Sequence, residues 1–263
     1  MLFKNISGVP DFKCEEYAPK KTKYCLLIPI INESGKIEKQ LERARTAGVG
    51  GVIDIIICDG GSTDGGADSG TLSALGVNCL LTKTGAGRQG AQLRMGLWWA
   101  LERGYEGFVT IDGNNKDSIE DVPVFTEKLE AGYDFVQGSR FIKGGRAVNT
   151  PLLRLFAVKC IHAPVISLTA GRRFTDTTNA YRAYSKKYIT HPEVQPFRDI
   201  FMSYELLAYL SVKASRLGLL VCEVPVVREY PKVGKTPTKI KGFRGNLLLF
   251  KILFKNAGGK YDV

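Results

Sequence analysis

The feature that most constrains this chain is the regular alternation of short strand-like runs with helical patterns between residues 24 and 140. Runs of strand length cover residues 24–31, 52–58, 77–81, 108–111 and 134–137. Between them, apolar residues recur at spacings of three and four, which is the pattern of a helix with one buried face. Strands and helices that alternate in this way are typical of a parallel, doubly wound sheet. The sequence therefore predicts an α/β fold with a mostly parallel central sheet.

The stretch YEGFVTIDGNNKD, residues 105–117, is a predicted buried strand that ends in a carboxylate. Small polar residues that cannot continue a strand follow Asp112. Ligands of open α/β sheets bind outside the carboxyl ends of the strands, so Asp112, Asn114 and Asp117 are predicted to cradle a divalent cation and its phosphates. The alternative is a polar strand-to-helix turn in which Asp117 or Ser118 caps the following helix.

Two glycine-rich stretches lie near other predicted strand ends. The sequence DGGSTDGG follows the run at 52–58 and places Asp59 at a second strand end, where glycines let the backbone approach a ligand closely. Gly85, Gly87 and Gly90 lead into a helical pattern, and a glycine-rich lead into a helix N-terminus suits an anion. Their spacing matches neither the dinucleotide fingerprint nor the phosphate loop of nucleotide triphosphatases.

Composition narrows the class of protein and its partners. The chain has 263 residues, a hydrophobic content of 44% and a net charge of +11, which indicates a globular protein with an anionic partner. No uninterrupted apolar run of about 18 residues and no signal-peptide pattern occurs, so a cytoplasmic location is expected. Its 6 cysteines form no CxxC pair, which suits a reducing compartment.

Basic residues gather at the C-terminal end of the chain. Eight Lys and Arg residues and no acidic residue lie between positions 231 and 260. The sequence predicts a mobile lead-in at 1–23, a single domain at 24–240 and a basic amphipathic helical extension at 241–263. The run from Lys239 to Lys255, KIKGFRGNLLLFKILFK, overlaps this extension and is predicted to lie peripherally on an anionic membrane surface. The alternative is a final helix that packs on the domain or on a partner subunit.

Six motifs in order carry a resemblance to a known family. They are IPIINE, ICDGGSTDGG, TIDGNNKD, VQGSRFIKGG, TDTTNAYRAYS and EVPVVREYPKVGKT, and they span about residues 24 to 240. With them the chain resembles the family two glycosyltransferases, and within these the dolichyl-phosphate mannose synthase and polyprenyl-phosphate sugar transferase group. The resemblance implies a GT-A nucleotide-sugar-binding fold. It further implies inverting transfer of a sugar from a UDP- or GDP-sugar to a polyprenyl phosphate or glycan acceptor, in cell-surface glycan or glycolipid synthesis, with Mg²⁺ or Mn²⁺.

The resemblance also implies roles for individual residues. Those expected to hold the donor nucleotide are Pro29, Glu33, Asp59, Gly61, Ser62 and Arg88. Those expected to meet the phosphates of donor and acceptor are Arg140, Arg154 and Arg228. Asp176 is the expected acceptor-side carboxylate, with Glu205 as second choice, and Arg182 closes the same motif. If the acceptor is a phosphate, it is already ionised, and Asp176 would orient it rather than act as a base.

The predicted metal turn departs from the family pattern. The family has Asp-x-Asp followed by a glutamine, where this chain has Asp112, Asn114 and Lys116. Losing one carboxylate weakens the attraction for a cation, and an inward-pointing Lys116 opposes it. Mg²⁺ or Mn²⁺ at Asp112 and Asn114 is still the expected cofactor, because hard cations commonly keep waters and use one or two carboxylates.

Three other functions compete with sugar transfer. A non-catalytic nucleotide-sugar-binding module is the alternative that Asn114 favours. A nucleotidyltransferase acting on a sugar phosphate is the second, although the glycine-rich sequence GAGRQG does not follow the first strand. Nucleic-acid binding is disfavoured because the basic C-terminal run lacks regularly interleaved aromatic residues. The two histidines, His162 and His191, lie far apart, so a histidine metal site is not expected.

Overall fold

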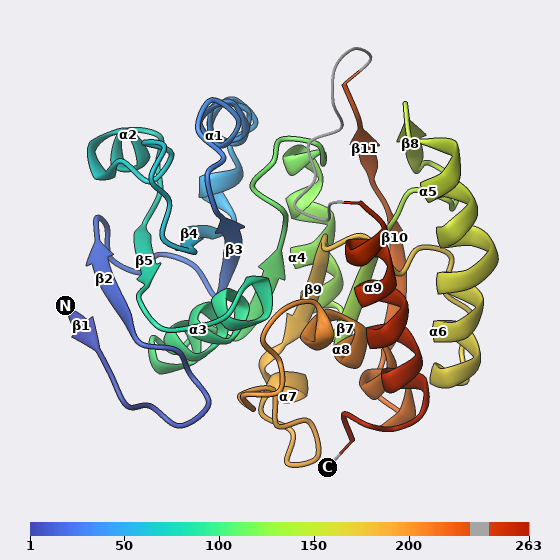
Figure 1. The fold of residues 1–263 in the computed structure, drawn as a ribbon. Helices are drawn as coiled ribbons and strands as arrows, with labels where there is room; N and C mark the ends of the chain where they lie inside the picture. Colours follow the sequence, from blue (N-terminus) through green and yellow to red (C-terminus); the bar gives the residue numbers. More distant parts are fainter. Residues whose placement is uncertain (232–241, 263) are drawn as a thin grey trace.

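The computed structural model describes residues 1–231 and 242–262. Within these residues nine strands form one sheet in the order β1-β2-β5-β4-β3-β6-β9-β7-β10, and β11 pairs with β8 in a small second sheet (Figure 1). The large sheet contains β1 (Leu2–Phe3), β2 (Phe12–Glu16), β3 (Tyr24–Ile30), β4 (Asp54–Asp59), β5 (Cys79–Lys83), β6 (Gly107–Thr110), β7 (Phe135–Ser139), β9 (Arg182–Ser185) and β10 (Val221–Pro225). The small sheet contains β8 (Arg146–Val148) and β11 (Val227–Glu229).

The predicted parallel arrangement is confirmed for the centre of the sheet. Strands β5, β4, β3 and β6 run parallel to one another. Leu27 of β3 packs into the core on one face of the sheet and Leu26 into the core on the other. Burial on both faces explains why these strands read as continuous apolar runs instead of alternating ones.

The second half of the sheet was not predicted in full. Strand β9 lies between β6 and β7 and runs antiparallel to both, whereas β10 pairs with β7 in parallel. The residues of β9 lie in the motif TDTTNAYRAYS, outside the strand-like runs that the sequence shows. This strand has only 4 residues and begins with Arg182, so its apolar content is too small to mark it.

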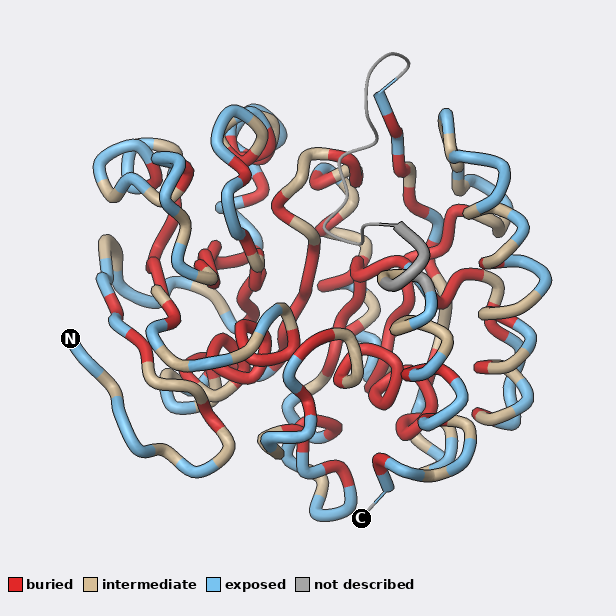
Figure 2. The backbone as a smooth tube through the Cα atoms, in the orientation of Figure 1, coloured by how far each residue is buried: buried red, intermediate tan, exposed pale blue. Residues whose placement is uncertain are grey.

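Helices cover both faces of the large sheet. One face carries α3 (Gln89–Glu102), α6 (Ala163–Ala170), α8 (Glu205–Arg216) and α9 (Gly242–Ala257). The other carries α1 (Ile37–Thr46), α2 (Ser69–Ala74) and α4 (Val122–Glu130). Shorter helices are η1 (Val49–Gly51), η2 (Ile119–Asp121), α5 (Leu152–Phe156), the π-helix η3 (Ala157–His162) and α7 (Lys186–Ile189). Figure 2 shows burial concentrated in the central strands and exposure in the outer helices and loops.

The expectation of a mobile lead-in at residues 1–23 was wrong. β2 pairs antiparallel with β5, and β1 pairs with β2, so the segment extends the sheet. Phe12 and Cys14 of β2 are buried, and the ring of Phe12 stacks on Phe3 at 4.7 Å between centroids. With two buried residues separated by an exposed one, β2 has the alternating pattern of a strand near a sheet edge.

The C-terminal helix α9 packs on the domain, as the alternative interpretation of this run proposed. Ile252 and Leu253 are buried in the core, and the Asn256 amide donates to the backbone carbonyl of Ala208 at 2.9 Å. Leu247 and Phe254 remain exposed. Of the predicted membrane run, residues 239–241 and the side chains of 242–244 and 246 lie outside the described residues.

A continuous helical stretch, residues 152–170, runs through α5, η3 and α6 along one side of the molecule (Figure 1). Among the described residues, the length of this stretch and the mean hydropathy of 1.5 over an 18-residue window of it would permit a membrane span, and 17% of that window is buried inside the protein. Leu152, Leu153, Phe156 and Leu168 are more than half exposed. Helix α9 packs beside α6 on the same side.

Candidate active site

The carboxyl ends of β3, β4 and β6 meet at one edge of the sheet. The register pairs Ile30 with Asp59, so the loops after β3 and β4 begin at the same level, whereas β6 ends at Thr110, which pairs with Leu27 three residues before the end of β3. The loops after β3 and β4 are joined directly, because the backbone amide of Asn32 donates to the Ser62 hydroxyl at 2.9 Å. The predicted nucleotide loops therefore form one surface.

Asp59 shapes the turn after β4. Its buried carboxylate accepts hydrogen bonds from the Gly61 amide at 2.9 Å and the Ser62 hydroxyl at 2.5 Å, and Gly61 has a φ of 93° that favours glycine. Pro29 and Glu33 flank this turn from β3 and its loop, with Glu33 buried beside Lys36. Contact of these residues with a nucleotide stays a prediction.

Two glutamines of α3, the helix that follows the glycine-rich stretch, form hydrogen bonds to groups at the ends of neighbouring strands. The Gln92 amide donates to the carbonyls of Ile30 at 2.6 Å and Cys58 at 2.7 Å, which locks the ends of β3 and β4 together. The Gln89 amide donates to Asp112 Oδ1 at 3.0 Å. Neither glutamine is among the predicted site residues, although their place one turn apart at the start of a helix that follows a glycine-rich stretch was a usable signal. The predicted nucleotide ligand Arg88 is exposed at the N-cap of α3.

The turn after β6 is tightly built. A Cβ on Gly113 would lie 2.4 Å from Ile30 Cγ2, so only glycine fits there. Asn115 adopts a φ of 55°, and its amide donates to the side chain of Gln40 at 2.8 Å. The amide of Lys116 donates to Asn114 Oδ1 at 3.3 Å. These contacts direct Lys116 inward, where 6% of it is exposed.

Arg228 joins the two carboxylates of this turn. Its Nη1 pairs with Asp117, which is buried, and its Nη2 lies 3.2 Å from Asp112 Oδ2. A backbone bridge between Asp117 and Arg228, and the Glu229 amide donating to the Lys116 carbonyl at 2.8 Å, hold β11 against the turn. The ion pair between Asp117 and Arg228, which lie 111 positions apart in the chain, thus joins the turn after β6 to β11.

Burial and charge set the ionisation of this turn. Burial would raise the pKa of Asp112, but Arg228 and Lys116 outweigh it and hold that pKa below its ordinary value. Burial raises the pKa of Asp117 to about 6 in spite of Arg228. Burial, and then the charge of Arg228, lower the pKa of Lys116 to about 8. At neutral pH the Lys116 ammonium is therefore still mostly protonated.

Three cationic side chains of the site lie close to the ring of Tyr230. The Lys116 ammonium lies 5.0 Å from the centre of its ring, and the guanidinium groups of Arg154 and Arg228 each lie 5.8 Å from it. Arg154 Nη1 also donates to the Tyr230 hydroxyl at 2.9 Å. Contacts of cations with a ring face are favourable. The predicted phosphate ligands Arg154 and Arg228 are therefore brought together, and Lys116 joins them.

Arg140 and Asp176 form a buried pair beside this cluster. Arg140 Nε and Nη2 lie 2.6 Å and 2.9 Å from the two oxygens of Asp176, and the side chains are 2% and 0% exposed. The backbone amide of Arg140 also donates to Asp176 at 3.3 Å. Glu223 accepts from the Asp176 amide at 3.2 Å and fixes its backbone. This geometry lets Asp176 position Arg140 and keeps it out of reach of an acceptor proton.

Comparisons with known proteins find relatives by sequence. No protein-family model matches the chain. The chain is 28% identical over 213 residues to the undecaprenyl-phosphate mannosyltransferase of Micrococcus luteus, covering 80% of this chain and 85% of the relative. It is 25% identical over 240 residues to the polyprenol monophosphomannose synthase of Mycolicibacterium smegmatis, covering 90% and 88%.

Comparison with solved structures identifies the fold. The UDP complex of glucosyl-3-phosphoglycerate synthase from Mycobacterium tuberculosis superposes with a TM-score of 0.63 at 18% identity, covering 89% of this chain and 80% of that chain. The chain is a glycosyltransferase with the GT-A fold. Its sequence relatives are the polyprenol-phosphate and dolichol-phosphate mannosyltransferases. Crystals of the synthase also contain Mn²⁺ with UDP-glucose, or Mg²⁺ with UDP.

The acidic turn of this glycosyltransferase does not fit a divalent cation. Asp112 already accepts from Gln89, Arg228 and Asn114, and the Asn114 contact measures 3.3 Å. Asp117 Oδ1 has no partner within the described part of the chain, but Asp117 is 0% exposed and leaves no room for the waters that Mg²⁺ keeps. The expected Mg²⁺ or Mn²⁺ at Asp112 and Asn114 is therefore at odds with the donor set.

Arg182 lies outside the site of the glycosyltransferase, which corrects the expected role in ligand binding. It is 1% exposed, and its three guanidinium nitrogens donate to the backbone carbonyls of Asn179, Leu207 and Thr177 at 2.5–3.0 Å. The bond to Leu207 ties β9 to α8, and the other two hold the loop before β9. The second-choice carboxylate Glu205 accepts from the Ser203 amide at 2.5 Å, at the start of α8.

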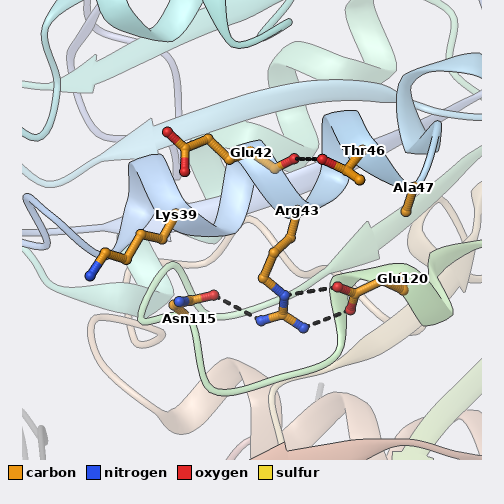
Figure 3. Close-up of a pocket in the computed structure, with 7 residues that line it drawn as sticks. All are labelled: Lys39, Glu42, Arg43, Thr46, Ala47, Asn115 and Glu120. Carbon is orange, nitrogen blue, oxygen red and sulfur yellow. Dashed lines mark hydrogen bonds and ion pairs between the residues drawn. The ribbon is translucent and has the colours of Figure 1, made fainter.

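A surface hollow of about 540 Å³ lies on the outer side of the acidic turn (Figure 3). Arg43 of α1 crosses it and donates to the Asn115 side chain at 2.8 Å and to Glu120 at 2.8 and 2.6 Å. None of the predicted donor ligands lines this hollow. Its side chains brace the turn from outside, so we assign the hollow no ligand.

Proposed function

We propose that the glycosyltransferase moves a sugar, with inversion, from a UDP- or GDP-sugar to a polyprenyl phosphate, in the synthesis of a cell-surface glycan or glycolipid. The observation that carries this proposal is the position of Arg154. It lies on the exposed apolar helical stretch 152–170 and also bonds to Tyr230 inside the cationic cluster. One side chain thus links an apolar surface suited to a prenyl chain with a site suited to its phosphate.

The chemistry of this reaction suits the side chains present. A phosphate oxygen of the acceptor attacks the anomeric carbon while the bond from that carbon to the nucleoside diphosphate breaks, and inversion follows from attack on the opposite face. The acceptor phosphate is already ionised, so no general base is needed. Negative charge develops on the departing diphosphate, and fixed guanidinium groups stabilise such charge. Arg228 and Arg154 are placed for this role, and Arg140 is held rigid by Asp176.

The test is transfer to a lipid phosphate. The purified protein is incubated with GDP-mannose, UDP-glucose or UDP-N-acetylglucosamine and undecaprenyl phosphate in vesicles, and the products are analysed by mass spectrometry and NMR. We expect one donor to yield a lipid-phosphate-linked sugar of inverted anomeric configuration, with undecaprenol inactive as the matched control. Equal transfer to undecaprenol, retained configuration, or transfer of the nucleotide itself would contradict the proposal.

We further propose that the glycosyltransferase meets its lipid through residues 152–170, as a peripheral protein on the cytoplasmic side of a membrane. The exposed positions Leu152, Leu153, Phe156 and Leu168 form the apolar part of this surface, and Lys159, Arg172 and Arg173 are exposed basic residues on or beside it. Apolar and basic residues together favour an anionic membrane surface. Arg154 on the same stretch bonds to the site, which favours a helix lying on the domain over one that crosses a bilayer.

This surface predicts the behaviour of a double variant. Leu153→Glu with Leu168→Glu is expected to reduce cosedimentation with phosphatidylglycerol-containing vesicles at least severalfold, because each replacement puts a carboxylate on the apolar surface. The melting temperature should stay close to wild type, since both side chains are exposed. Leu220→Glu is the control, because Leu220 is 57% exposed but lies outside this stretch. Unchanged sedimentation of the double variant, or an equal loss in the control, would refute the assignment.

A further inference from the structure

We propose that Lys116, with Arg228 beside it, supplies the positive charge that holds the donor diphosphate, so that the glycosyltransferase binds its donor without a divalent metal. This inference rests on the proposed function, because it concerns the same donor. It goes beyond that function by assigning a ligand role to Lys116, for which the motif pattern provides none.

The position of Lys116 is the first support. A lysine in a surface turn normally extends its ammonium into water. Here the left-handed backbone at Asn115, the bond from the Lys116 amide to Asn114 and the bond from Glu229 to the Lys116 carbonyl hold the residue inward. The ammonium lies over the Tyr230 ring at 5.0 Å, in the turn that follows a central strand of the GT-A sheet.

The surrounding charges are the second support. Asp112 and Asp117 are the carboxylates of the turn, and Arg228 pairs with both. Among the described side chains of the cluster, Arg228, Lys116 and Arg154 contribute three positive charges against the two negative charges of Asp112 and Asp117, which leaves a net charge of +1. Buried cations that face one another persist when an anion compensates them, because a low-dielectric surrounding strengthens their repulsion. A diphosphate has the charge and the acceptor oxygens to do so.

The chemistry of the turn is the third support. Relative to an Asp-x-Asp-x-Gln turn, Asn114 removes one negative charge and Lys116 adds one positive charge. Together these two replacements equal the charge of one divalent cation, and they lie in the same turn as Asp112. Asn114 is also a weaker ligand for a hard cation than a carboxylate. An ammonium fixed by the backbone, unlike a bound metal ion, cannot be removed by a chelator.

The test is calorimetric titration of the wild-type protein with UDP and with GDP, in EDTA and then in Mg²⁺ or Mn²⁺. We expect one nucleotide to bind in EDTA with the same affinity as in either metal. Affinity that is lost in EDTA and restored by Mn²⁺ would overturn the inference and leave the proposed function intact. Failure of both nucleotides to bind in every buffer would overturn the proposed function and the inference with it.

Variants make the test specific to Lys116. Lys116→Met is expected to lower nucleotide affinity about tenfold or more with no recovery in Mn²⁺, because it removes a charged donor to phosphate. Lys116→Arg should retain part of the affinity, and Lys4→Met, at an exposed lysine, is the matched control. Melting temperatures verify that each variant is folded. Unaltered affinity in Lys116→Met would overturn the inference.

A second variant reverses the proposed replacement. Asn114→Asp combined with Lys116→Gln is expected to bind the nucleotide weakly in EDTA and to regain affinity in Mn²⁺. The spectrum of free Mn²⁺ in electron paramagnetic resonance should decrease when this double variant and the nucleotide are added together, beyond the decrease that the nucleotide alone causes. The wild-type protein should cause no such further decrease. A wild-type protein that depletes free Mn²⁺ as the double variant does would count against the inference.

Discussion

Arg228→Ala is expected to abolish nucleoside-diphosphate binding and to lower the free energy of unfolding by about 3–5 kcal/mol. The physical reason is that one guanidinium compensates two carboxylates, Asp117 at 0% and Asp112 at 22% side-chain exposure. Removing it leaves both charges without their main partner, and uncompensated buried charge is among the most destabilising defects in a protein. Urea denaturation measures the stability, and calorimetry with UDP and GDP measures the binding.

The pH dependence of this variant has a definite sign. Burial already raises the pKa of Asp117 to about 6 in the wild-type protein, and removing Arg228 raises it further. A carboxyl whose pKa is higher in the folded state stabilises the fold below that pKa and destabilises it as pH rises. The stability difference between the variant and wild type should therefore be larger at pH 8 than at pH 5.

The matched control for Arg228→Ala is Arg172→Ala, which removes an exposed arginine with no ion pair among those that the described residues form. This control should keep wild-type stability and nucleotide affinity. If Arg228→Ala binds nucleotide normally, or loses no more stability than the control, the central role given to Arg228 is wrong.

Asp176→Asn is expected to lower the free energy of unfolding by about 3 kcal/mol and to reduce turnover far more than donor affinity. Asp176 forms both ion-pair contacts with the buried guanidinium of Arg140, and asparagine cannot compensate that charge. Arg140 would then lose the orientation in which it can meet a phosphate. Urea denaturation and steady-state kinetics with each substrate varied provide the measurements.

Two further measurements separate positioning from base catalysis at Asp176. The double variant Arg140→Met with Asp176→Asn should recover part of the lost stability, because it removes the uncompensated charge, yet it should remain inactive. Residual turnover of Asp176→Asn should keep the wild-type pH profile if Asp176 positions Arg140. Disappearance of the acidic limb of that profile would instead identify Asp176 as a general base.

Much of the fold was predictable from the sequence, because the signals that specify it are local. The runs that became β3, β4 and β6 are apolar throughout, since those strands are buried on both faces, and the helices between them carry one apolar face. Turn residues with special backbone requirements, such as Gly61 at a φ of 93°, mark the strand ends. Position at a predicted strand end is also enough to single out Asp59 and Asp112 in the sequence. For the same reason the weakly apolar strands β2 and β9 were missed.

The arrangement of charges was decided by the tertiary structure alone. Nothing in the local sequence pattern shows that Arg228 pairs with Asp117, 111 residues away. Nor does it show that Asp176 forms a buried ion pair with Arg140. The sequence alone does not distinguish Arg182 from Arg228. In the folded protein, however, the guanidinium nitrogens of Arg182 donate to backbone carbonyls inside the core. Periodicity and turn chemistry depend on neighbours in the chain, whereas the ionisation and exposure of a charged side chain depend on groups that only folding brings within a few ångströms of it. The direction in which Lys116 points, and with it the choice between metal and ammonium, therefore had to come from the structure.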